Sequence, residues 1–275
     1  LHQRAKGLRI LLHGISSNHR SPYLAPHVKS GLSAGDDVLS IALRGVLGRG
    51  HDHFHAGLTN DLHEVIADPD LSGYQEISLI GCSMGGLVTL NFALECKDSR
   101  VRGVAAICPP IQLDVIQAHL DQPQQALYRR LILSRIKTPY QSIWHNAQRA
   151  QMPLGSDLQA VLSARSIEEW DRVVILPRFE FESTDEYYAQ VSISTAQLQE
   201  APIPSLLVFD RGDPMIPLPL LNLTENLVKP SYESLCTIKF TRGGGHINFP
   251  RALDLGYEGS LGIAGQVGAW FNTLK

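Results

Sequence analysis

The sequence predicts an α/β fold: a mostly parallel sheet with helices on both faces and a mainly helical insertion. Short apolar runs alternate with helical patterns over the first 110 residues or so. Such runs are absent from the middle third of the chain and return near residue 204. Parallel strands covered on both faces are typically continuous apolar runs. We therefore expect a core formed by 1–111 and 201–275, with 112–200 inserted as a cap.

Four apolar runs in the first part of the chain have the composition of buried strands: LRILLHG (8–14), DDVLSIAL (36–43), EISLIG (76–81) and VRGVAAIC (101–108). Between them, apolar residues recur at helical spacing in TNDLHEVIA (59–67) and GGLVTLNFALEC (85–96). Thr59 is a residue type that caps helices through its hydroxyl, so we expect the first helix to start there. Strands that alternate with helices in this way form a parallel sheet.

The insertion has long helical patterns, QAHLDQPQQALYRRLILSRI (117–136) and SDLQAVLSA (156–164), together with prolines and aromatic residues. We expect about half of its aromatic side chains to line a pocket and the rest to pack: Tyr128, Tyr140, Trp144, Trp170, Phe179, Phe181, Tyr187 and Tyr188. Buried strands are predicted again at PSLLVFD (204–210) and CTIKF (236–240), and a final helix at 265–274.

The composition excludes some classes of function. The net charge is −3 and the pI is about 6.4, so no basic surface is available for nucleic acid. No apolar run approaches the roughly 18 residues that a membrane-spanning helix needs. The cysteines lack CxxC spacing, which favours buried free thiols and a cytoplasmic location: Cys82, Cys96, Cys108 and Cys236. Because the first residue is Leu1 and not Met, we expect a segment to precede it.

The segment IGCSMGGL (80–87) contains Gly81-x-Ser83-x-Gly85 between a predicted strand and a predicted helix. This pattern is typical of the sharp turn that holds a nucleophilic serine in an α/β-hydrolase fold. A serine hydroxyl is a weak nucleophile, and it needs a base to take its proton and an acid to orient that base. In this fold the acid and then the histidine follow the serine in the chain.

The sequence offers one histidine beyond residue 213, and this is His246, which follows three glycines after the last predicted strand. The acid is expected just after the preceding strand, where both Asp210 and Asp213 are possible. We favour Asp213 because it lies past the end of the strand and Pro214 restricts the chain behind it. The spacing thus predicts Ser83, Asp213 and His246 as a catalytic triad.

A tetrahedral intermediate needs two backbone N–H donors for its oxyanion. The N–H of Met84 follows the nucleophile at the start of a helix, where the helix dipole also favours negative charge. The second donor is expected to be the N–H of Ile15, in the loop after the first strand, where Gly14 lets the backbone approach the substrate. His13 is expected to have a structural hydrogen-bonding role.

Segments along nearly the whole chain resemble the YheT-like branch of the α/β-hydrolase superfamily, also called the AB hydrolase 4 family, in the same order: HGISSNHRSPY (13–23), LRGVLG (43–48), HAGLTNDL (55–62), GCSMGG (81–86), EEWD (168–171), DEYYAQVS (185–192), FDRGDPMIP (209–217) and GGGHINF (243–249). The resemblance implies a carboxylic-ester hydrolase with Ser83, Asp213 and His246 as its triad. It also implies that one or two further strands precede Leu1. Ser17, Met84 and Leu87 depart from the usual family residues, Ser17 in the oxyanion loop.

The apolar cap favours a small-molecule ester of short or medium acyl length, with no cofactor and no metal. There are two alternatives to this esterase function. One is a (lyso)phospholipase or thioesterase with the same triad, and the other is a hydrolase fold used only for binding. A zinc site at His51, His53 and His55 is a further alternative, since on an extended chain they project to one side. Without a second ligand cluster, we expect these three to be solvated loop histidines.

Overall fold

Six parallel strands form one sheet in the computed structural model, which describes residues 7–217, 220 and 235–274. The strand order is β2-β1-β3-β4-β5-β6. The bounds are β1 (Gly7–Leu12), β2 (Asp37–Ile41), β3 (Glu76–Cys82), β4 (Val101–Ile107), β5 (Ser205–Asp210) and β6 (Cys236–Thr241). All six predicted strands are therefore present, and their carboxyl ends lie at one edge of the sheet.

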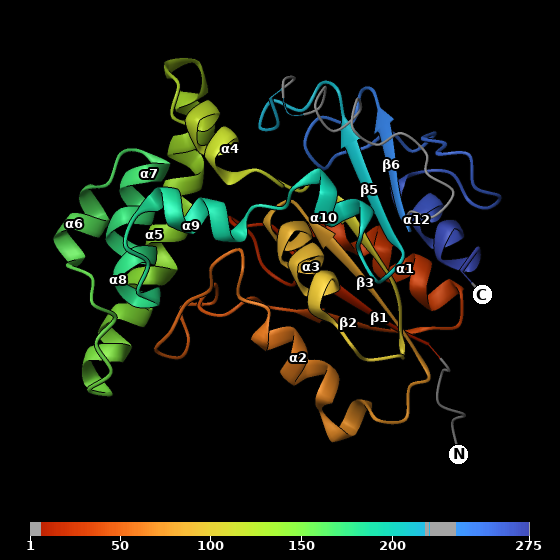
Figure 1. Cartoon of the computed structure of the whole chain (residues 1–275), viewed down its shortest axis with the longest axis horizontal. Helices are drawn as coiled ribbons and strands as arrows, with labels where there is room; N and C mark the ends of the chain where they lie inside the picture. Colours follow the sequence, from red (N-terminus) through yellow and green to blue (C-terminus); the bar gives the residue numbers. More distant parts are fainter. Residues whose placement is uncertain (1–6, 218–219, 221–234, 275) are drawn as a thin grey trace.

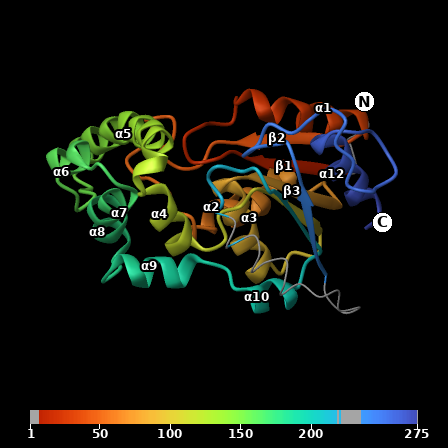
Figure 2. The same cartoon turned by 90° about the horizontal axis from the view of Figure 1, so that it is seen from above.

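Helices cover both faces of the sheet (Figures 1 and 2). The helices that follow β1, β2, β3 and β6 are α1 (Ala25–Ser33), α2 (Asn60–Ala67), α3 (Met84–Glu95) and α12 (Ile263–Asn272). Leu11 and Ile80 point to one face and pack with α1 and α12. Ile10 and Leu79 point to the other face and pack with α2 and α3. Burial on both faces is why the strands are continuous apolar runs.

The expected cap of α2 is not formed. Thr59 has helical backbone angles, and its hydroxyl donates a hydrogen bond to the carboxylate of Glu95 at the end of α3. A hydroxyl used in this tertiary contact does not cap its own helix. The start of the helix was predicted correctly to within one residue, but the reason given for it was wrong.

The stretch between β4 and β5 is helical, and most of it lies to one side of the sheet, whereas its last helix lies near α3 (Figures 1 and 2). Its elements are α4 (Leu113–Leu120), α5 (Ala126–Arg149), α6 (Leu158–Ser163), α7 (Ile167–Trp170), the π-helical turn η4 (Asp171–Ile175), α8 (Leu176–Phe179), α9 (Thr184–Val191) and α10 (Thr195–Gln199). Short 3₁₀ turns occur at Pro22–Leu24, Pro69–Leu71 and Pro123–Gln125. That residues 112–200 form a separate cap domain stays a prediction.

The single helical pattern predicted over 117–136 is divided between α4 and α5. The break contains Pro123, which has no backbone N–H to donate and is therefore disfavoured in the interior of a helix. The second helix, α5, is 24 residues long and contains Pro139. Among the helices that the structure describes, α5 included, none is long and apolar enough to cross a membrane.

Candidate active site

Ser83 lies in the sharp turn that joins β3 to α3. Its backbone angles, φ 52° and ψ −124°, are strained for a residue with a side chain. The turn closes so tightly that a Cβ added to Gly81 would lie 2.2 Å from the carbonyl oxygen of Gly85. A Cβ added to Gly85 would lie 2.4 Å from the carbonyl oxygen of His13. The two glycines of the motif are therefore required by close backbone packing around Ser83.

This packing can be tested with Gly85→Ala, which we expect to destabilise the protein by about 3 kcal/mol because backbone must move to admit the methyl group. The measurement is the free energy of unfolding in urea. Gly35→Ala is the control: an added Cβ at Gly35 contacts nothing within 4 Å, although φ there is +82°. An equal loss in both variants would show that steric overlap is not what requires Gly85.

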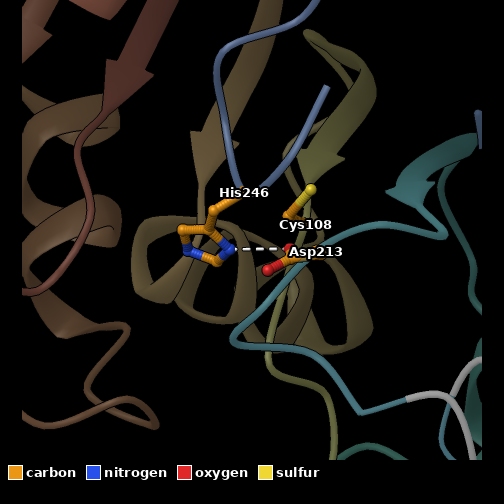
Figure 3. A group of neighbouring side chains, drawn as sticks. All are labelled: Cys108, Asp213 and His246. Atoms are coloured by element: carbon orange, nitrogen blue, oxygen red, sulfur yellow. Dashed lines mark hydrogen bonds and ion pairs between the residues drawn. The ribbon is translucent and has the colours of Figure 1, made fainter. Parts of the chain in front are cut away.

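Ser83, His246 and Asp213 form a hydrogen-bonded series at the carboxyl edge of the sheet. The Ser83 hydroxyl donates to Nε2 of His246 at 2.8 Å. Nδ1–H of His246 donates to Oδ2 of Asp213 at 2.7 Å (Figure 3). The other carboxylate oxygen of Asp213 accepts from the N–H of Met215 at 2.8 Å. The structure thus brings together three residues that lie after β3, β5 and β6 in the chain.

Asp210, the other acid considered from the sequence, is held away from His246. Its Oδ1 accepts from the N–H of Gly212 at 2.9 Å, and its Oδ2 accepts from the Thr241 hydroxyl and the N–H of Gly244, each at 2.8 Å. These bonds join the loop that carries Asp213 to the loop that carries His246. Asp210 is therefore placed to fix the two loops, and Asp213 is the acid that contacts the imidazole.

Cys108 is a neighbour of this series that the sequence did not reveal (Figure 3). It follows β4 with a φ of 48°, and its thiol donates to the carbonyl of Gly245 at 4.0 Å. Burial and the carboxylate of Asp213 raise its pKa well above the ordinary value, so the thiol stays protonated. Like the other three cysteines, it is buried and takes part in no disulfide bond. Its position directly after a buried strand, as for Ser83, was the available signal.

The side chains of Cys108, Asp213 and His246 place ligand atoms within 4.8 Å of one another. Among the residues that the structure describes, they form the one group of His, Cys, Asp or Glu that could hold a metal ion. A protonated thiol is a poor ligand, and the imidazole and carboxylate already hydrogen bond to each other. This donor set fits proton transfer better than metal binding.

The two expected oxyanion donors lie on either side of Ser83. Met84 is the first residue of α3, and Ile15 follows the end of β1. Within the described part of the chain, neither N–H has a backbone hydrogen-bond acceptor. A Cβ added to Gly14 would lie 3.1 Å from Cβ of Ser83, so the loop passes close to the serine. Both amides therefore remain available near the hydroxyl.

The loop after β1 is fixed by its own hydrogen bonds. Nδ1–H of His13 donates to the carbonyl of Gly14 at 2.8 Å, and Nε2 accepts from the N–H of Leu43 at 3.1 Å. Burial lowers the pKa of His13 to about 4, which keeps the ring neutral, as its structural role requires. Ser17 donates to the carbonyl of Gly14 at 2.9 Å and contacts the Tyr23 hydroxyl at 2.5 Å. Ser17 therefore supports the loop.

A cavity of about 420 Å³ opens beside Ser83 and His246 and extends among α4, α5, α7, η4 and α9. Four of the eight aromatic residues considered from the sequence line it: Tyr140, Trp170, Tyr187 and Tyr188. The lining is otherwise mostly aliphatic, as in pockets for small ligands. The expectation that about half of these aromatic residues face a pocket is met.

Among the described residues, the one group that could hold a metal ion does not include the three histidines of HDHFH. His53 is buried with its ring 5.4 Å from that of Tyr140, and His55 lies 4.4 Å from the ring of Phe179. Burial lowers their pKa values to about 3 and about 4. The expectation of solvated loop histidines was wrong for these two, because the segment packs beneath the inserted helices.

Known proteins share this architecture. A model of the alpha/beta hydrolase family matches residues 10–254. Protein abhd-3.2 of Caenorhabditis elegans is 24% identical over 266 residues, which are 92% of this chain and 66% of the relative. The chain therefore spans about two thirds of that relative's length.

Two solved esterases resemble the chain in fold. The esterase Pf2001 of Pyrococcus furiosus has a TM-score of 0.53 at 18% identity, over 89% of this chain and 75% of its own. Est1E of Butyrivibrio proteoclasticus, solved with ferulic acid bound, has a TM-score of 0.53 at 17% identity, over 90% of this chain and 83% of its own. Because the family model matches most of its length, the chain belongs to the alpha/beta hydrolase family.

Proposed function

We propose that the protein is a serine hydrolase that cleaves carboxylic esters through Ser83, His246 and Asp213. The observation that carries the proposal is the hydrogen-bonded series of these three side chains at the mouth of a largely apolar cavity. A serine whose hydroxyl donates to an imidazole, itself held by a buried carboxylate, is equipped for nucleophilic attack on a carbonyl carbon. The esterase folds described above support the same reaction class.

In the proposed mechanism, Nε2 of His246 accepts the hydroxyl proton as Oγ of Ser83 attacks the ester carbonyl. Asp213 accepts the hydrogen bond from Nδ1–H and stabilises the imidazolium that forms. The N–H groups of Ile15 and Met84 bind the oxyanion. His246 then gives the proton to the departing alcohol, which leaves an acyl-enzyme. In the second half of the reaction His246 takes a proton from a water molecule as this water attacks the acyl-enzyme, and it returns the proton to Oγ of Ser83 as the acid is released.

The substrate that we propose is a small ester of short or medium acyl length. Each methylene buried in the apolar cavity contributes about 0.8 kcal/mol until the space is filled. The order of its motifs supports placing the chain in the YheT-like branch, and its four buried free thiols support a cytoplasmic location. Thioesters and lysophospholipids would use the same three side chains, so labelling of Ser83 does not by itself distinguish them from simple esters.

The test is labelling by a fluorophosphonate together with turnover of p-nitrophenyl esters from about two to sixteen acyl carbons. We expect mass spectrometry to find the label on the peptide that contains Ser83, and kcat/KM to reach its maximum at about two to eight carbons. A chelator should leave the activity unchanged. Activity that rises steadily to the longest chain, with faster turnover at a lipid interface, would instead indicate a lipase. No label on Ser83 would contradict the serine mechanism.

A further inference from the structure

Asp171 is a buried acid that the proposed mechanism does not use. It is the first residue of the π-helical turn η4, it is 8% exposed, and it lines the same cavity as Ser83. Its Oδ2 accepts a hydrogen bond from the Tyr188 hydroxyl at 2.8 Å. Its Oδ1 accepts none from any residue that the structure describes. Oδ1 is not among the described polar atoms that are buried from solvent without a partner, so this oxygen of a cavity-lining side chain is accessible to a ligand group that can donate to it.

The other polar side chains of the cavity wall are mostly paired within the protein. The Tyr140 hydroxyl contacts that of Ser156 at 2.7 Å, and Arg44 is held by Asp52 at 2.9 Å and by Asp61. Gln117 donates to Asp121 at 2.6 Å. Asp171 is an exception to this pairing, because one of its carboxylate oxygens accepts no hydrogen bond from the described part of the protein.

His53 is the second exception. It lines the cavity and is 8% exposed, and its Nε2 is buried without a hydrogen-bond partner. Its ring lies 6.3 Å from that of Trp170, the residue before Asp171. Polar atoms without a hydrogen-bond partner among the described residues therefore occur on two neighbouring parts of the cavity lining.

The electrostatic surroundings of Asp171 indicate which ligand group fits. Burial is the main cause that raises the pKa of Asp171 to about 7; the carboxylates of Asp121 and Glu168 contribute to this rise, and the hydrogen bond from Tyr188 opposes it. His53 is neutral because burial lowers its pKa to about 3. Arg44 is paired, and Arg135 lies exposed on α5 at the rim. A carboxylate would be repelled here, whereas a hydroxyl or an ammonium group would supply the missing donor.

We propose that the cavity selects esters whose chain carries a hydroxyl or ammonium group, which donates a hydrogen bond to Oδ1 of Asp171. The proposal rests on the proposed function and specifies its substrate class. A site built to accept a hydrogen bond discriminates against an analogue without the donor, because the buried oxygen then stays unpaired. The rest of the chain would contact the aliphatic wall.

The test compares matched esters of about six carbons that differ in the terminal group: methyl, hydroxyl, ammonium or carboxylate. One series carries the group on the acyl chain of a p-nitrophenyl ester, and the other carries it on the alcohol of an acetate ester. We expect, in one series or both, kcat/KM for the hydroxyl or the ammonium ester to exceed that for the methyl ester by about tenfold or more. The carboxylate ester should be the poorest substrate.

Two variants separate this role from a structural one. Asp171→Leu should reverse the ranking and favour the methyl ester, because an apolar side chain of similar size replaces the acceptor. Asp185→Leu is the matched control, since Asp185 is an exposed residue of α9 that does not line the cavity; it should leave the hydroxyl-to-methyl ratio within about twofold. A ratio of rates is insensitive to partial loss of folded protein.

Each outcome has a distinct meaning. The inference would be overturned if the methyl ester were cleaved as well as the hydroxyl and ammonium esters in both series. It would also be overturned if Asp171→Leu kept the preference for the hydroxyl or ammonium ester. Either result would leave the proposed function standing. If no ester is cleaved, the proposed function fails, and calorimetric binding of the same esters to Ser83→Ala protein decides the inference alone. Equal Kd values for the hydroxyl, ammonium and methyl esters would then overturn it.

Discussion

Replacing Ser83 by alanine is expected to lower kcat/KM for a p-nitrophenyl ester by about 10⁴- to 10⁶-fold. His246→Ala should cause a loss of similar size, because without the imidazole the hydroxyl has no base. The double variant should lose little more kcat/KM than either single variant, since the effects of replacing residues that act as one catalytic unit are not additive. Steady-state kinetics on the three variants measures all of these values.

The stability of the variants is the control for this comparison. Thermal unfolding should give nearly the same Tm for the wild type and Ser83→Ala, because the hydroxyl contacts His246 in a partly open site. Fluorophosphonate labelling should disappear in Ser83→Ala. Losses that multiply in the double variant would mean that the two side chains act in separate steps, and the proposed triad would be wrong.

Asp213→Asn should lower kcat by about 10⁴-fold with little change in KM for the ester. An amide in place of the carboxylate can no longer stabilise the imidazolium, and it can hold the ring in the wrong tautomer. The fully buried Asp213 carboxylate accepts the 2.7 Å hydrogen bond from His246, so no water is placed to replace it. The measurement is kcat and KM for one ester.

Asp210→Asn provides the matched control, with the same substitution three residues earlier. Here the expected loss is in stability, about 1 to 3 kcal/mol, because the new NH₂ group cannot accept all the hydrogen bonds that Asp210 receives from Gly212, Thr241 and Gly244. Its kcat should fall much less than that of Asp213→Asn. The reverse ranking of kcat would assign the acid to Asp210.

The parts of the fold that the sequence predicted are those set by local patterns. A strand buried on both faces needs a continuous apolar run, so all six strands could be located. The strand-to-helix turn at Ser83 needs small residues at fixed spacing, and the order of the chain then pointed to Asp213 and His246. These three residues follow strands whose carboxyl ends meet at one edge, and their side chains form hydrogen bonds there; their catalytic roles stay a prediction.

The parts that the sequence missed depend on contacts between distant segments. Thr59 is a residue type that often caps helices, but its hydroxyl donates a hydrogen bond to Glu95 on another helix. HDHFH has the polarity of a loop, yet Tyr140 and Phe179 of the inserted helices cover His53 and His55. The packing of Cys108 under the His246 loop and the free oxygen of Asp171 likewise arise only when the chain is folded.

The long separation between serine and histidine has a consequence for synthesis on the ribosome. Ser83 precedes its base by 163 residues. At about 5 to 20 residues per second, roughly 8 to 33 s pass between the emergence of the two side chains. During this interval β3 and α3 can form the turn, but the hydroxyl has no imidazole to accept its proton. In the proposed mechanism, the nascent chain is therefore inert toward esters until β6 and the loop after it have been translated.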